Sequence, residues 1–210
     1  MDLQLWLTFV AASTAFLLIP GPTVLLVLSY ALSQGRSVAL ATVAGVALGD
    51  VIAMSASLAG LGALVLTTAT LFVALKWVGA LYLIYLGVKL LRSASTTTLG
   101  EIATRGTSTG RNVFGHATAV TALNPKSIVF FIAFVPQFVT PERALLPQFV
   151  ILIATFVGLA VINTLSYALL ADRLRHRIAR PSVLAWFTRL GGGALISMGV
   201  MTAALKRATG

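Results

Sequence analysis

The chain has 210 residues, of which 58% are hydrophobic and 10% are charged, and it contains no cysteine. Soluble domains carry roughly 25% charged residues, so this composition favours a multi-span membrane protein and excludes an added soluble domain of any size. The lack of cysteine excludes disulfides and Cys-ligated metal sites. The formal net charge is +10, but the basic residues separate apolar runs instead of forming one surface stripe, which argues against nucleic acid as a partner.

Long apolar runs dominate the chain, and about 20 such residues cross a bilayer. On this measure the sequence predicts an all-α membrane protein with six transmembrane segments. In chain order the predicted segments are Leu3–Leu32, Val38–Leu66, Thr70–Leu91, Asn112–Val139, Ala144–Leu170 and Leu190–Leu205.

The first and fourth segments are long and are interrupted by proline. Pro20 and Pro22 flank Gly21 in the first, and Pro125 interrupts the fourth. Proline removes a backbone donor, and the freed carbonyls are tolerated at membrane depth only beside protein or a polar cavity. Each segment is therefore predicted to break, either as a kinked span or as a helix followed by a re-entrant half-helix.

Loop charges predict the orientation. With the N-terminus outside, the first, third and fifth loops face the cytoplasm and carry most of the Lys and Arg residues, as the positive-inside rule requires. The third loop, rich in Ser, Thr and Gly, reads as a flexible linker. The predicted units are a first repeat at 1–92, a cytoplasmic linker at 93–111 and a second repeat at 112–210.

The two halves carry matching residues. Pro22 corresponds to Pro125, and Gly45 with Asp50 corresponds to Gly158 with Asn163. The glycine pair 79 and 87 corresponds likewise to the pair 191 and 199. Three spans per half would make the second half enter from the opposite side, which predicts two inverted three-segment repeats of the kind that secondary transporters use.

Asp50 is the candidate functional acid. It is the only carboxylate deep within an apolar segment, where a charge is costly unless it is paired, protonated or hydrated. Because desolvation favours the neutral form of a carboxyl group, Asp50 is a candidate for proton coupling as well as for substrate binding. The alternative is a structural ion pair with a lysine.

Two helix starts are candidate anion sites. Asn124 is a good N-cap and Pro125 a good first helical residue, so a half-helix is expected to begin there with Lys126 in its first turn. Gly21-Pro22-Thr23 makes a similar start. Such ends attract anions, whereas a lysine that only reaches the membrane interface is the alternative for Lys126.

The same breaks also provide acceptors for a cation. The carbonyls of Phe16 and Leu18 lose their usual donors to the two prolines of the first segment. An anion-attracting helix start beside free carbonyls and a carboxylate would suit an α-amino acid zwitterion. Its carboxylate would lie at Thr23 or Lys126, and its ammonium at Asp50 or the free carbonyls.

Two further polar residues are weaker candidates. Asn163 in the fifth segment is either a binding residue or a hydrogen-bonding link between helices. His116 is either a proton relay, second in line after Asp50, or a structural histidine.

These motifs together resemble the LysE/RhtB amino-acid exporter family over nearly the whole chain. The resemblance implies export of amino acids or close derivatives from the bacterial cytoplasm, driven by an ion gradient, across the inner membrane. The residues that carry it are Pro20, Gly21, Pro22, Gly45, Gly49, Asp50, Lys76, Gly79, Ala80, Tyr82, Leu83, Gly87, Asn124, Pro125 and Lys126.

The expected partners are therefore an amino acid, a coupling ion, taken to be H⁺, and membrane lipid, with no cofactor and no metal. The sequence is compatible with a homo-oligomer but does not specify one. An intramembrane aspartyl enzyme would need two carboxylates that share a proton, and Asp50 has no second acid at depth. A channel, or a transporter of a metal ion or an anionic metabolite, remains as the alternative.

Overall fold

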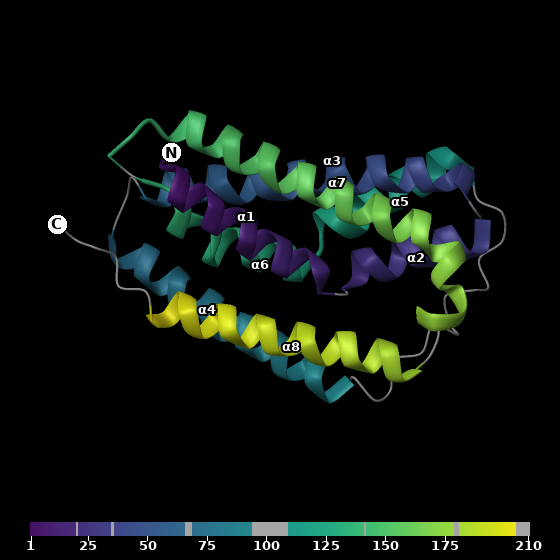
Figure 1. Ribbon diagram of the computed structural model, residues 1–210. Coiled ribbons are helices and arrows are strands. Elements are labelled where there is room, and N and C mark those ends of the chain that lie inside the picture. Colours follow the sequence, from purple (N-terminus) through teal and green to yellow (C-terminus); the bar gives the residue numbers. More distant parts are fainter. Residues whose placement is uncertain are drawn as a thin grey trace.

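The computed structural model describes residues 1–19, 21–34, 36–65, 69–93, 109–140, 142–178 and 181–204. All regular elements within these residues are helical, as the sequence predicts (Figure 1). In chain order they are α1 (Leu3–Leu18), α2 (Pro22–Gln34), α3 (Arg36–Val65), α4 (Ala69–Ser93), α5 (Gly110–Ala122), α6 (Pro125–Ala133), the 3₁₀ helix η2 (Val135–Phe138), α7 (Leu145–Ile178) and α8 (Pro181–Ala204).

Both predicted breaks are confirmed. The chain bends by 59° between α1 and α2 and by 45° between α5 and α6. Pro22 and Pro125 each occupy the first position of the helix that follows the bend, where the missing N–H costs nothing. Pro20 lies outside the described residues.

The described helices include two that are long and apolar enough to cross a membrane, within α3 (Val38–Gly60) and α7 (Leu145–Leu169). The number rises to four if each bent pair counts as one span. In α4 and α8 the described apolar stretches are shorter, at Trp77–Lys89 and Leu195–Ala204. Within its described residues the protein is thus all-helical with two to four candidate membrane spans, and the arrangement of six segments stays a prediction.

Helix ends near the fifth loop differ from the prediction. The stretch Arg173–Arg180 is expected to be a loop, but α7 continues to Ile178 and α8 already begins at Pro181, ahead of the predicted start at Leu190. Leu, Arg and Ala are good helix formers and proline is favoured at a helix start, so local preference extends both helices. Most of the predicted 93–111 linker lies outside the described residues.

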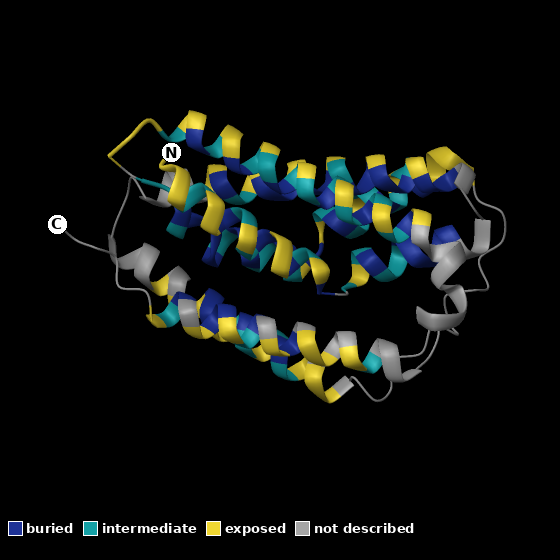
Figure 2. Ribbon diagram, in the orientation of Figure 1, coloured by how far each residue is buried: buried dark blue, intermediate teal, exposed yellow. Residues whose placement is uncertain are grey.

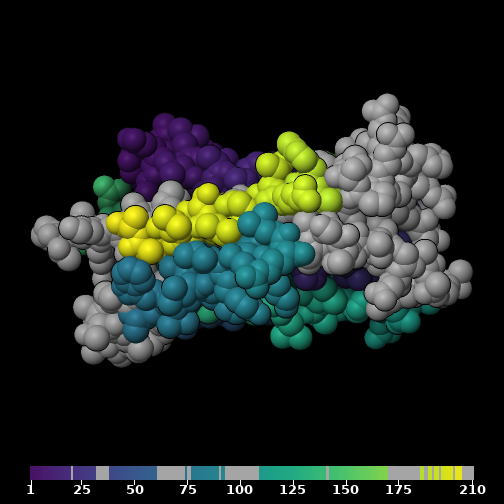
Figure 3. Space-filling view, turned by 90° about the horizontal axis from the view of Figure 1, so that it is seen from below, coloured from purple at the N-terminus to yellow at the C-terminus, as the bar shows by residue number. Residues whose placement is uncertain are grey.

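Glycines allow two helix pairs to pack closely. A Cβ on Gly49 of α3 would lie 2.6 Å from the Cβ of Thr121 in α5. Gly87 of α4 and Gly192 of α8 face each other, because a Cβ on either would lie within 2.7 Å of the carbonyl oxygen of the other. Figure 3 shows α4 and α8 side by side across one face of the molecule. The match of Gly158 with Gly45 does not extend to packing, since nothing lies within 4 Å of a Cβ at Gly158.

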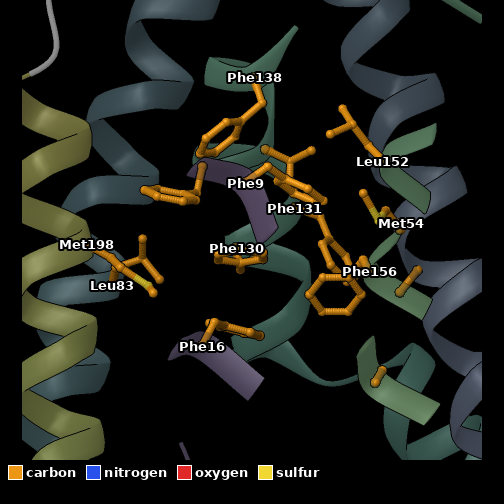
Figure 4. Packing of buried hydrophobic residues seen from close by; sticks show 14 of the residues in the cluster. Phe9, Phe16, Met54, Leu83, Phe130, Phe131, Phe138, Leu152, Phe156 and Met198 are labelled. Carbon is orange, nitrogen blue, oxygen red and sulfur yellow. The ribbon is translucent and has the colours of Figure 1, made fainter. Parts of the chain in front are cut away.

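An aromatic cluster forms the core beside the α1–α2 break (Figure 4). The rings of Phe16 in α1 and Phe130 in α6 stack with centroids 4.0 Å apart, and Phe156 of α7 packs against both. Figure 2 shows the buried residues turned toward the helix interfaces. Large apolar side chains such as Leu40 and Ile162 are more than half exposed, which suits contact with lipid.

Candidate functional site

The two helix starts that follow the breaks meet at the centre of the site. Asn124 caps α6, because its Oδ1 accepts a hydrogen bond from the backbone N–H of Lys126 at 3.1 Å. The Nδ2 of the same side chain donates to the hydroxyl of Thr23 in α2 at 3.2 Å. The hydroxyls of Thr23 and Thr121 lie 3.4 Å apart. One asparagine therefore joins two helix starts that are about a hundred residues apart in sequence.

The Lys126 side chain extends from the start of α6 to the C-terminal end of α1. Its Nζ donates to the carbonyl oxygen of Ile19 at 2.8 Å and to that of Phe16 at 3.1 Å. The ammonium also lies 4.3 Å from the centroid of the Phe16 ring. Carbonyls at a helix C-terminus carry partial negative charge, and a cation over an aromatic face is attracted to it, so each contact stabilises the buried charge.

The structure shows which carbonyls the break of the first segment makes available, and they differ in part from the prediction. The Phe16 carbonyl accepts from Lys126 as one of the two predicted acceptors, and the second carbonyl that the lysine uses is that of Ile19, which was not predicted. Ile19 has an extended backbone and its own N–H turns back to the Phe16 carbonyl at 3.2 Å. The chain therefore leaves the helix with the Ile19 carbonyl directed at the lysine.

Gly21 gives this lysine the room that it needs. A Cβ at Gly21 would lie 3.3 Å from Cδ of Lys126 and 3.6 Å from its Nζ. Such a contact is tight enough that the lysine chain would have to shift by a few tenths of an ångström. The Pro-Gly-Pro motif thus serves two purposes, since its prolines interrupt the helix and its glycine lets a side chain from the other half approach.

Asp50 lies across from this lysine, in the middle of α3. Its side chain is 3% exposed, and none of the described residues donates a hydrogen bond to it or forms a direct ion pair with it. Asp50 and Lys126, which have opposite formal charges, line the same small cavity. The neighbouring Gly49 holds this part of α3 against Thr121 of α5, which fixes the carboxylate close to the second helix start.

Asn163 of α7 is the counterpart of Asp50 in the predicted repeat, and it too lies at the site. Its Nδ2 donates to the carbonyl oxygen of Leu17 at 3.1 Å. Three carbonyls at the end of α1 therefore accept from side chains of the second half: those of Phe16 and Ile19 from Lys126, and that of Leu17 from Asn163. The match between Asp50 and Asn163 places a polar side chain from each half beside the same break.

A small cavity connects these groups. Its volume is about 30 Å³, measured as the space open to the centres of water-sized molecules, which is room for roughly two waters. Phe16, Val24, Val46 and Ala160 supply apolar parts of its wall. The predicted site residues in the wall are Gly21, Thr23, Asp50, Asn124, Lys126 and Asn163.

The other predicted residues that the structure describes are not in the cavity wall. Pro22 and Pro125 begin the adjoining helices without lining the space. His116 lies on α5, where its Nδ1 is 2.9 Å from the hydroxyl of Tyr30 in α2. This contact ties α2 to α5 and makes a structural role for His116 sufficient. In the described part of the chain, no three His, Asp or Glu side chains are grouped as metal ligands would be.

Sequence reasoning missed Ser127 and Thr164, which also line the cavity. Ser127 follows Lys126 in the first turn of α6, and Thr164 follows Asn163 in α7. Each is therefore next in sequence to a predicted site residue, and this adjacency is the only feature of the sequence that could have identified them. Neither residue type is unusual within an apolar helix, which is why the pattern alone did not select them.

Comparison with known proteins agrees with the membrane character of the fold. The sequence matches the LysE type translocator family over residues 14–205. It is 32% identical to a homoserine/homoserine lactone efflux protein of Salmonella typhimurium over 208 residues, covering 99% of this chain and all of the relative. It is also 32% identical over 210 residues to an uncharacterized membrane protein of Vibrio cholerae, covering 98% of this chain and 100% of the relative.

A leucine efflux protein of Salmonella choleraesuis is 35% identical over 137 residues, which cover 65% of this chain and 64% of the relative. No solved structure matches the chain.

Proposed function

Because the chain belongs to the LysE type translocator family, we propose that it is a secondary transporter that exports amino acids or close derivatives from the cytoplasm. The membership makes it a multi-pass membrane protein and a transporter, not an enzyme. The proposed location is the inner membrane of a bacterium, and the proposed coupling is antiport with protons.

The observation that carries this proposal is the presence of an acidic and a basic side chain in the wall of one cavity where two broken helices meet. Broken helices at membrane depth are typical of transporter binding sites. Buried Asp50 and Lys126 are costly in lipid and are expected to serve function. An amino acid zwitterion offers one group to each kind of partner present here.

The helix starts are suited to a carboxylate. The free N–H groups at the beginning of α2 and α6 carry partial positive charge, and Thr23 and Asn124 add polar side chains. The C-terminal carbonyls of α1 and the Asp50 carboxylate are suited to an ammonium. The proposed substrate therefore spans the cavity from one helix end to the other.

The rest of the cavity wall favours an uncharged side chain. Val24, Val46 and Ala160 are apolar and small, and Asp50 is the one acid that the described wall contains. A basic substrate would need a second carboxylate. The relatives named for homoserine and leucine efflux point the same way, since both of those amino acids have neutral side chains.

The proposed architecture is two inverted repeats of three membrane segments each, joined by the 93–111 linker. The two bent helix pairs support it. So does the position of Asp50 and Asn163 on α3 and α7, because one comes from each half and both line the same cavity. The loop charges favour a cytoplasmic linker and an external N-terminus.

Asp50 is the proposed coupling group. A carboxylate that is deep in the membrane and adjacent to the substrate can gain a proton from one side and release it on the other. His116 is the second candidate, but its partner Tyr30 already explains its position.

A resistance screen tests the function. Bacteria that express the chain would be challenged with a panel of toxic amino-acid analogues, with cells that express Asp50→Asn as the matched control. We expect resistance to one or more neutral analogues in the first cells and sensitivity in the control. Sensitivity to the whole panel despite normal amounts of protein in the membrane would contradict the proposal.

A further inference from the structure

The ammonium of Lys126 occupies the place in the cavity that best suits the amino group of a substrate. It has two carbonyl acceptors at 2.8 and 3.1 Å and an aromatic face at 4.3 Å. These are partners that any primary ammonium would use. The carbonyls of Phe16 and Ile19 come from the broken end of α1, so they exist because of the Pro-Gly-Pro interruption.

The size of the cavity makes this occupation significant. With the lysine in place the space holds about two water molecules, and both carbonyls already accept from its ammonium. The lysine Cδ and Nζ pass beside Gly21 and fill the approach to the two carbonyls. A substrate whose ammonium is to reach these acceptors therefore has to displace the lysine.

We propose that the carbonyls of Phe16 and Ile19 are the subsite for the substrate's amino group, and that Lys126 fills this subsite in the empty transporter. The inference rests on the proposed function and makes it more specific. The substrate class is compounds with a free primary ammonium, and acids without an amino group or with an acylated one are excluded.

Asp50 is the group toward which Lys126 moves when the substrate displaces it. The two side chains have opposite formal charges and line the same cavity, and no described residue is hydrogen-bonded to the carboxylate. When the substrate ammonium takes the carbonyls, Lys126 moves toward Asp50 and toward the substrate carboxylate. The bound state then contains two positive and two negative charges, so the zwitterion adds no net charge to the buried site, and Lys126 lies between the two carboxylates.

The first test removes the lysine and replaces it from solution. Truncation in Lys126→Ala deletes three carbons and the ammonium, and n-propylammonium carries the same atoms. We expect this cation to bind the purified variant saturably and to raise its melting temperature by a few degrees through preferential binding to the folded state. Propionate, with the same length and the opposite charge, should have no such effect.

Wild-type protein and Lys89→Ala are the matched controls, since Lys89 is an exposed lysine on α4. Neither should respond to n-propylammonium. No response in Lys126→Ala, or equal responses in all three proteins, would overturn the assignment of the carbonyl pair. If Lys126→Ala does not fold, Lys126→Ser takes its place, because it is also short and leaves the space of the lysine chain open to n-propylammonium.

The second test asks whether the substrate uses the same place. The carboxamide of the exported amino acid has the ammonium but no carboxylate, so it gains nothing from a lysine near the carboxylate position. It should bind Lys126→Met about tenfold or more tightly than wild type, because it no longer has to displace a resident cation. On Lys126→Ala, n-propylammonium should compete with the amino acid itself.

Unchanged or weaker carboxamide binding, or simultaneous binding of amino acid and n-propylammonium, would overturn the inference. The proposed function and the assignment of the carbonyl pair are tested by different experiments. Absence of export in the resistance screen removes the proposed function, whereas the n-propylammonium titration decides by itself whether the carbonyl pair holds an ammonium.

Discussion

Asp50→Asn tests the coupling role of the buried carboxylate while preserving its shape. Loss of one partner from a direct buried ion pair costs about 3–5 kcal/mol. The described contacts of Lys126 are instead with the carbonyls of Phe16 and Ile19, and they survive the substitution. We therefore expect a stability change of about 1 kcal/mol or less, the scale of a single altered polar contact, together with loss of gradient-driven transport.

The assay uses everted membrane vesicles with an imposed pH gradient and the labelled amino acid found in the resistance screen. Protein amount is measured in the same vesicles, and Asp2→Asn, which changes an exposed acid outside the helices, is the control. Normal amounts of Asp50→Asn without accumulation of the amino acid are expected. Accumulation equal to wild type would refute the coupling role and direct attention to His116, whereas strongly reduced protein would indicate a structural ion pair.

Three other predictions concern packing and topology. The chain has no native cysteine, and the hydroxyls of Thr23 and Thr121 lie 3.4 Å apart. The double variant Thr23→Cys with Thr121→Cys should therefore form a disulfide on oxidation and stop transport until the disulfide is reduced. Free thiols after oxidation would contradict the geometry. Gly192→Val should destabilise the α4–α8 pair by about 1–3 kcal/mol through overpacking, as measured by SDS titration. Gly193→Val should be nearly neutral, because nothing lies within 4 Å of a Cβ added at this position. Equal effects of the two substitutions would argue against the pairing. Reporter fusions in the 93–111 linker should be active only in the cytoplasm, and periplasmic activity would reverse the proposed orientation.

The features that sequence could predict are local ones. The prolines at 22 and 125 mark the helix breaks because a missing N–H acts on its own neighbours. Asn124 is recognisable as an N-cap from the residue types around it. Asp50 stands out because a charge in a long apolar run has to be explained. The structure shows the bends beside Pro22 and Pro125, the Asn124 cap and the burial of Asp50.

The partners of these residues could not be predicted, because they depend on how distant helices pack. The acceptors of Lys126 lie more than a hundred residues earlier in the chain. Lys126 was expected to bind an anion. In the structure its ammonium is instead hydrogen-bonded to carbonyls at the end of α1, where the substrate's amino group was expected to bind. The predicted repeat correctly suggested that Asn163 lies near Asp50 in the cavity wall. It did not predict the surroundings of Gly158, because matching residues in two halves need not have the same packing neighbours.

Accessibility of the cavity to the substrate is the most direct test of the central claim that the two helix starts bound the transport site. Thr23→Cys should react with a water-soluble thiol reagent in membrane vesicles, and the exported amino acid should slow the reaction at concentrations that saturate transport. Thr14→Cys, at an exposed position of α1, should show no protection by the amino acid. A cysteine at position 23 that is unreactive from both sides of the membrane, or that reacts at the same rate with and without the amino acid, would contradict the account.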